Sequence, residues 1–256
     1  MLSQIYAQLG DREPRQLGYQ LQREERKAVD TALQKCHGSY GIQLGSEQNW
    51  LSTPIIRRSF TVTAEPAPGY DLVSCFNALP FAENSVDVIF LPHVLEFCSH
   101  PAEVLAEAAR ILTPSGNLLI LCFNLTSLWG VRRLMSWGQN KKQPPWNGRF
   151  YTKLQLQWWL HEAELSLTNS LCLFFRPPLD AKHDLSKWQS MELMGRFCWP
   201  AFGASCLYVA TKRVLPLLPI KPIWQEEKLR PVAGLTPAAH RLEQPQDVTC
   251  PIQKNH

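Results

Sequence analysis

The chain has 256 residues, of which 45% are hydrophobic, 19% charged and 10% aromatic. This is the composition of an ordinary globular protein and excludes a disordered or fibrous chain. The formal net charge is only +4, from 26 basic and 22 acidic residues, which neither demands nor excludes nucleic-acid binding.

The first part of the chain predicts an arm, a helix and two strands. Residues 1–18 are polar and interrupted by glycine and proline, which indicates an arm. Residues 19–35 carry apolar side chains on one side and charges on the other, as in an amphipathic helix. Two short runs, 40–44 and 60–64, end at glycine or proline and are predicted as strands.

The middle of the chain predicts a βαβ unit. Residues 86–91 are almost uniformly apolar, as in a parallel strand that is buried on both faces. Residues 101–112 have helical spacing of apolar side chains, and a turn at 113–116 separates them from the apolar run 118–123. A strand, a helix and a second strand in this order indicate a right-handed crossover.

The last part of the chain predicts two helices, two closing strands and a tail. These elements are expected at 127–137, 152–163, 171–175 and 206–211. Seven of the chain's twenty prolines follow Val214, so residues 214–256 are predicted as a partly disordered Pro-rich tail. The expected organisation is an arm at 1–18, a domain at 19–213 with a cap-like segment at 127–163, and this tail.

The sequence predicts no membrane segment, no export signal and no metal site. The longest uninterrupted apolar run is 118–123, far short of the roughly 20 residues that cross a bilayer. No basic patch followed by an apolar stretch begins the chain, so a cytoplasmic protein is expected. The eight cysteines form no CxxC pair and no metal-ligand spacing with histidine, which predicts reduced thiols.

One stretch is more specific than these patterns. The segment LPFAENSVDVI at 79–89 resembles the LPF-x-x-x-S-x-D-x-V stretch of class I S-adenosylmethionine-dependent methyltransferases, in the broad branch that alkylates small molecules. The similarity continues through LPHVLE at 91–96 and EAARILTPSG at 107–116, and FNLTSLWG at 123–130 looks like a bacterial subgroup of unassigned substrate. The resemblance covers residues 71–130 and implies a doubly wound, mostly parallel α/β sheet, the Rossmann-like methyltransferase fold.

The cofactor loop departs from the family pattern. Members usually end the first strand with D-x-G-x-G-x-G, because bare glycine backbone must approach the methionine portion of the cofactor. Here the equivalent stretch is IQLGSEQN at 42–49, in which Gly45 remains but Gln43 replaces the acid and the later glycines are absent. Glu47 adds a negative charge where the cofactor's carboxylate is expected, which is unfavourable unless the side chain turns outward.

The resemblance assigns two further contacts to S-adenosylmethionine. Glu65 follows the second predicted strand, where an acidic side chain accepts both ribose hydroxyls in this fold. A solvated loop carboxylate is the alternative for Glu65. The acid expected near the adenine is Cys75, so the adenine is expected to lie against Asn77, Ala78 and Leu79, with Asn77 as a substitute hydrogen-bonding partner.

His93 is the candidate catalytic residue. It follows the fourth strand next to Pro92, where open α/β sheets bind their ligands, so the methyl acceptor is expected to approach over Pro92 and His93. A histidine near its ordinary pKa could deprotonate the acceptor. The alternative is that His93 makes structural hydrogen bonds, in which case alignment alone would support transfer.

Three hypotheses for function follow. The preferred one is an S-adenosylmethionine-dependent methyltransferase acting on an unidentified, small-molecule acceptor. The second is a catalytically inactive methyltransferase fold that serves as a binding or regulatory partner, as the eroded glycine loop suggests. The third is a nucleic-acid or membrane-surface binder, because residues 127–151 interleave aromatic and basic side chains. Neither the acceptor nor the oligomeric state is predicted.

Overall fold

The computed structural model describes residues 2–9, 17–52, 54–135, 145–177, 195 and 199–212. The predicted tail at 214–256 and the loop at 136–144 lie outside the described residues. None of the described helices combines the length and the apolarity that a membrane span requires.

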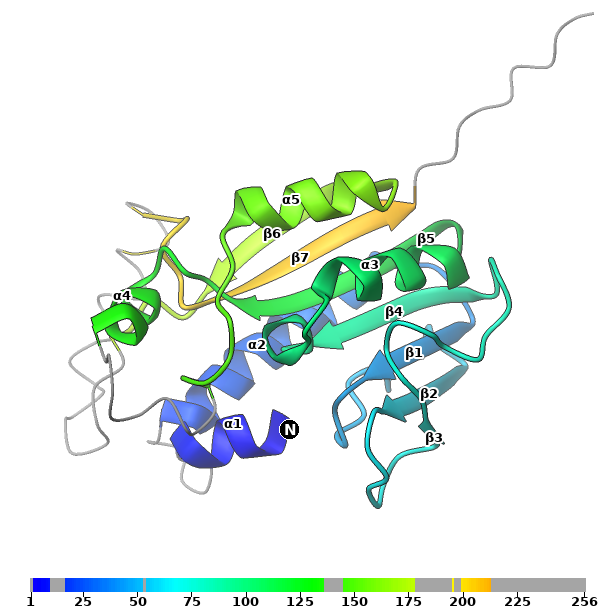
Figure 1. Ribbon diagram of the computed structural model, residues 1–256, viewed down its shortest axis with the longest axis horizontal. Coiled ribbons are helices and arrows are strands. Elements are labelled where there is room, and N and C mark those ends of the chain that lie inside the picture. The colour runs from blue at the N-terminus through cyan, green and yellow to red at the C-terminus, as the bar shows by residue number, and fades with distance from the viewer. Residues whose placement is uncertain are drawn as a thin grey trace, which may run out of the picture. The chain divides into compact units, whose positions relative to one another are not determined.

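Within the described residues, seven strands form one sheet in the order β3-β2-β1-β4-β5-β7-β6 (Figure 1). Their bounds are Tyr40–Leu44 (β1), Arg58–Thr63 (β2), Leu72–Val73 (β3), Val86–Pro92 (β4), Leu112–Phe123 (β5), Leu165–Leu173 (β6) and Ser205–Lys212 (β7). The strands β1 to β5 pair in parallel, and β7 is antiparallel to both β5 and β6. The predicted doubly wound, mostly parallel sheet is confirmed.

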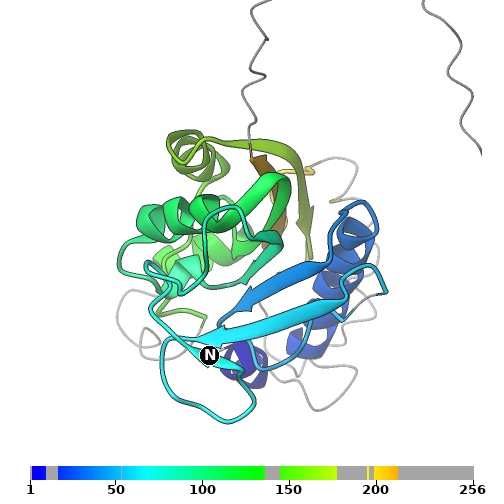
Figure 2. The ribbon, with the colours of Figure 1, turned by 90° about the vertical axis from the view of Figure 1, so that its right-hand side faces the viewer.

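Helices cover both faces of the sheet, as Figures 1 and 2 show. They are α1 (Leu2–Leu9), α2 (Leu17–Leu33), the 3-10 helix η1 (Leu95–Phe97), α3 (Pro101–Ile111), α4 (Leu128–Met135) and α5 (Lys153–Glu162). Successive residues of β4 point to opposite faces of the sheet. Ile89 packs in the core beneath α3 and α5, whereas Phe90 packs with α1 and α2. This alternation explains the nearly continuous apolar run of a strand that is buried on both faces.

The first three crossovers of the sheet contain no helix among their described residues. Loops at 45–57 (residue 53 aside), 64–71 and 74–85 connect β1 to β2, β2 to β3 and β3 to β4. The face that such a crossover helix would cover at β1 is covered instead by α2, which precedes β1, and by the buried Trp50, whose ring lies 5.6 Å from that of Phe90. The carboxyl ends of β1 and β2 are therefore followed by loops alone.

Asp87 ties together the starts of three strands. Its Oδ2 accepts hydrogen bonds from the backbone N–H groups of Ser39 (2.7 Å) and Tyr40 (3.1 Å). Its Oδ1 accepts one from the hydroxyl of Thr113 at 3.2 Å. Asp87 therefore aligns β1, β4 and β5 at their amino ends, far along the strands from the expected ligand edge.

Three expectations from the sequence are corrected. The segment predicted as a loose arm contains helix α1, whose Ile5 and Tyr6 are buried. β6 begins at Leu165, not at 171, because an edge strand with an exposed side tolerates the polar run that the sequence shows there. Cys172 and Cys206, expected as thiols, face each other in the β6–β7 register and form a disulfide.

Candidate functional site at the carboxyl edge of the sheet

The loop after β1 is organised by the side chain of Gln43. The buried amide Nε2 donates hydrogen bonds to the carbonyl oxygens of Ser46 and Gln48, and Oε1 accepts one from the backbone N–H of Trp50 at 2.8 Å. A carboxylate could not donate to the two carbonyls, so glutamine at this position suits a loop that folds back on its own strand. Glu47 of this loop is exposed, as an outward-turned side chain would be.

Gly45 occupies a backbone conformation and a space that favour glycine. Its φ is +71°, and a Cβ atom at this position would lie 3.0 Å from Cγ2 of Val94. Val94 follows β4, so the loops after β1 and β4 approach each other closely here. Gly45 is buried, and its lack of a Cβ atom lets the side chains of Val94 and Phe76 pack against the backbone here.

The structure places the other predicted cofactor residues around the same edge. Glu65 lies exposed just beyond β2, and no described residue hydrogen bonds to its carboxylate. Ala78 is exposed, whereas Leu79 and Pro92 are buried. Asn77 is exposed, but its amide donates to Glu103 of α3 at 3.1 Å. Three different strand ends thus contribute to the edge, with Asn77 turned toward a helix.

Two side chains of α3 hold the loop that contains Leu79 and Phe81. Glu107 Oε1, on α3, accepts the backbone N–H of Leu79 at 2.7 Å. Arg110 bonds to Glu107 through Nε (2.8 Å) and donates through Nη2 to the carbonyls of Leu79 and Phe81. Hydrogen bonds from Arg110 lower the pKa of Glu107. The E-x-x-R pattern therefore fixes the loop that contains Leu-Pro-Phe.

His93 lies at the centre of a buried polar network. Its Nδ1 is 2.8 Å from Oε1 of Glu96, and its Nε2 is 3.2 Å from Oε1 of Glu25 on α2. The hydroxyl of Tyr6 on α1 donates to Oε2 of Glu25. All four side chains are at most 2% exposed. The network therefore closes the carboxyl end of β4 beneath α1 and α2.

The network determines the charge of His93. Burial alone would lower the pKa of His93, but the adjacent Glu96 and Glu25 carboxylates raise it to about 10. At neutral pH the ring is an imidazolium that donates from both nitrogens. His93 also has a φ of +52°, which is strained for a residue with a side chain. Its hydrogen bonds and packing hold it there.

Glu25 and Tyr6 are site residues that the sequence reasoning missed. Glu25 lies in α2 among Leu21, Ala28 and Val29, all buried. A single acid on the apolar stripe of an amphipathic helix was the signal that could have found it, because an unpaired buried carboxylate is costly. Tyr6 lies in the segment predicted as an arm and carried no signal.

The aromatic and basic segment at 127–151 is largely turned inward in its described part. The rings of Trp129 and Trp146 stack at 5.7 Å, and that of Trp129 lies 5.8 Å from Phe123. Arg132 lies over Trp146 and Arg133 over Phe150. The faces of these rings are covered by one another and by arginine side chains, so they are not available to stack against nucleic-acid bases.

Part of this edge is similar to known proteins. Residues 61–120 match the methyltransferase domain family, and this segment contributes the ends of β2 and β4 together with β3 and α3. The uncharacterized protein YafS of Escherichia coli is 35% identical over 163 residues, which span 62% of this chain and 62% of YafS. The match therefore covers less than two thirds of that relative's length.

Two solved structures show the same fold. A methyltransferase in complex with the Haloferax volcanii Trm112 methyltransferase activator is 20% identical, with a TM-score of 0.54 over 76% of this chain and 91% of that one. Geranyl diphosphate C-methyltransferase from Streptomyces coelicolor is 10% identical, with a TM-score of 0.52 over 74% of this chain and 75% of that one. The matched segment at 61–120 and the likeness to these two structures give the chain the Rossmann-like fold of methyltransferases.

Proposed function

We propose that the protein is an S-adenosylmethionine-dependent methyltransferase that acts on a small-molecule acceptor. The observation that carries the proposal is the position of the family-matched segment: residues 61–120 supply the ends of β2 and β4, at the edge where the loop after β1 presents Gly45. The strand order reverses between β1 and β4. Open α/β sheets bind their ligands at the carboxyl ends of the strands on either side of such a reversal.

The residues at this edge fit S-adenosylmethionine. Gly45, with its positive φ, shapes the loop after β1 that would meet the methionine portion, and the exposed carboxylate of Glu65 can accept hydrogen bonds from both ribose hydroxyls. The exposed Ala78 and the buried Leu79 offer a surface for the adenine, and Pro92 borders it from β4. When bound, the cofactor supplies an electrophilic methyl group on a sulfonium.

The network around His93 fixes the charges beneath this edge. Because His93 is already protonated, it cannot take a proton from the acceptor at neutral pH. We infer that it acts instead as a fixed cation, which holds the carboxylates of Glu25 and Glu96 in position. Oε2 of Glu96 is buried and lacks a hydrogen-bond partner among the described residues.

Calorimetric titration with S-adenosylmethionine and S-adenosylhomocysteine tests cofactor binding. Glu65→Ala removes charge-assisted hydrogen bonds worth about 1.5–3 kcal/mol, so we expect the Kd to rise about tenfold or more. Glu83→Ala is the matched control, an exposed glutamate in the loop before β4, and should leave the Kd unchanged. Unmeasurable binding to the unmodified protein would contradict the proposal.

A second experiment tests the acceptor class. The protein is incubated with cofactor labelled in the methyl group and a bacterial extract, which is then separated by dialysis into small molecules and macromolecules. We expect label in the dialysable fraction. Label confined to protein or nucleic acid would refute the small-molecule part and leave the methyltransferase part standing.

An inactive relative that serves as a binding or regulatory partner is the second candidate. The observation in its favour is Gln43, whose amide bonds to the β1 loop from within, where the family usually has an acid. The same calorimetry separates the two candidates. Measurable binding of S-adenosylmethionine favours the enzyme, whereas its absence favours the inactive relative.

A further inference from the structure

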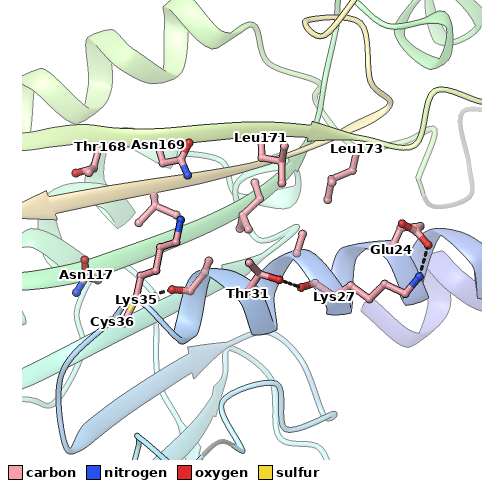
Figure 3. Close-up of a pocket in the computed structure, with 14 residues that line it drawn as sticks. Glu24, Lys27, Thr31, Lys35, Cys36, Asn117, Thr168, Asn169, Leu171 and Leu173 are labelled. Carbon is pink, nitrogen blue, oxygen red and sulfur yellow. Dashed lines mark hydrogen bonds and ion pairs between the residues drawn. The ribbon is translucent and has the colours of Figure 1, made fainter. Parts of the chain in front are cut away.

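A hollow of about 480 Å³ lies away from the carboxyl edge, between α2 and the sheet strands β5, β6 and β7 (Figure 3). It follows the second half of α2 and the turn after it, from Glu24 to Lys35. Its volume falls in the range of small-ligand sites, roughly 300–1,000 Å³. Neither the family resemblance nor the proposed function uses this hollow.

A bulge in β6 builds one wall of the hollow. Leu167 pairs with Ala210 and Asn169 with Val209, so Thr168 is an extra residue in the strand. Because side chains alternate between faces, the extra residue moves Asn169 and the residues after it to the α2 face, whereas Leu167 packs on the α5 face. Without the bulge, the wall beside α2 would present different side chains.

The floor of the hollow is apolar. It consists of Leu171, Leu173, Leu207 and Val209 from the two antiparallel strands, with Ala28, Ala32 and Cys36 on the helix side. The alanines leave room between the helix and the sheet. Leu171 remains 48% exposed, although a leucine in a sheet face usually packs against a neighbour. The floor therefore suits a ligand with an aliphatic portion.

One end of the hollow carries a lysine and two amides. Figure 3 shows Lys35, Asn117 and Asn169 toward one end, and Glu24 and Leu173 toward the other. Lys27 is paired with Glu24 at 2.7 Å, but no described residue pairs with Lys35 or hydrogen bonds to the side chains of the two asparagines. Among the described residues that line the hollow, Lys35 therefore carries the positive charge that has no counter-ion.

We propose that this groove binds an aliphatic chain with an anionic head group. The head group, a carboxylate or a phosphate, lies at Lys35 and accepts hydrogen bonds from the amides of Asn117 and Asn169. The chain lies along the leucine and valine floor toward Leu173. Charge complementarity selects the head group, and the apolar area selects the chain.

Calorimetric titration of the full chain with four probes that share a ten-carbon chain, each below its micelle concentration or solubility limit, tests the proposal. Decanoate and decyl phosphate should bind, 1-decanol should bind at least about tenfold more weakly, and decyltrimethylammonium should not bind. The ratio of the two anion affinities distinguishes a free carboxylate from a phosphate head group. Lys35→Glu should weaken both anions at least about tenfold. Lys153→Glu, an equal charge change on α5, should leave them unchanged.

Ala32→Phe fills the groove without changing its charge and should abolish binding of every probe, with circular dichroism confirming the fold. Lys35 is exposed, so Lys35→Glu decides the matter even if Ala32→Phe does not fold. Equal binding of decanol and decanoate, or unchanged affinity in Lys35→Glu, would overturn the proposal. It would also be overturned if either variant altered the mass of the protein in sedimentation, because the groove would then be a contact between copies of the chain.

Discussion

Nε2 of His93 lies 3.2 Å from Oε1 of Glu25, although 68 residues of chain separate them. His93 follows β4 inside the family-matched segment, whereas Glu25 belongs to α2, which precedes the sheet. The contact joins the segment that matches the methyltransferase domain family to a helix outside that segment. The surroundings of His93 therefore depend on both parts of the chain.

Removal of Glu25 should destabilise the protein strongly. In Glu25→Ala the buried His93 keeps one carboxylate partner and Tyr6 loses its acceptor, so we expect the free energy of unfolding to fall by about 3–5 kcal/mol. Urea denaturation measures the change. The neighbouring Glu24→Ala, at a surface ion pair with Lys27, should change it by less than about 1 kcal/mol. A similar small change in Glu25→Ala would show that the network contributes little.

The same network predicts how stability depends on pH. The pKa of His93 is about 10 in the folded protein and about 6.5 when unfolded, so the folded state binds the proton more tightly. The stabilisation is complete below pH 6.5 and is lost as the pH rises through 10. We expect the free energy of unfolding to decrease between pH 7 and 9, with a slope of at most about 1.4 kcal/mol per pH unit.

His93→Gln should remove that decrease, because glutamine does not titrate. Nitrogen chemical shifts of the His93 ring in the unmodified protein measure the same pKa directly, even if the variant does not fold. A ring that loses its proton near pH 6.5 would contradict the assignment of His93 as a fixed cation.

Gly45 and Gly69 form a matched pair for testing the loop after β1. Both have positive φ, +71° and +86°, but a Cβ atom would meet Val94 at Gly45 and nothing within 4 Å at Gly69. Gly69→Ala should cost only the left-handed backbone strain, about 1–2 kcal/mol. Gly45→Ala should cost more and should weaken binding of S-adenosylhomocysteine. Equal costs in thermal denaturation would mean that Val94 moves aside easily.

The hydrogen bonds that lock the Leu-Pro-Phe loop (79–81) to Glu107 of α3 should be detectable by hydrogen exchange. Glu107→Ala frees the backbone N–H of Leu79, so we expect that amide to exchange at least about tenfold faster while the amides of β4 are unaffected. Because its pKa is lowered, Glu107 stays ionised in the folded protein below its ordinary range, and the lock should open only as the pH falls further. Unchanged exchange at Leu79 would show that the loop is held by its packing alone.

The predictable part of the molecule lies where local pattern and tertiary environment agree. β4 and α3 were predicted within a residue or two, because a doubly buried strand and an amphipathic helix each have a distinct hydrophobic period. The start of β6 was predicted wrongly, because its pairing with β7 and its bulge at Thr168 depend on the partner strand and not on its own residues. Of the candidate site, the sequence indicated Gly45, Glu65 and His93, and the structure brings them to one edge; their roles toward a ligand stay predictions.

The order of apolar and polar residues by itself predicted the sheet and the edge at which a ligand is expected, because these follow from periodicity. The short motifs between residues 79 and 130 indicated the resemblance to methyltransferases. The tertiary structure decided what surrounds His93. Only folding brings Glu25 and Tyr6 beside it, and two carboxylates in a buried site reverse the effect of burial on its pKa. A residue that reads in the sequence as a neutral base is, for that reason, a cation in the folded protein.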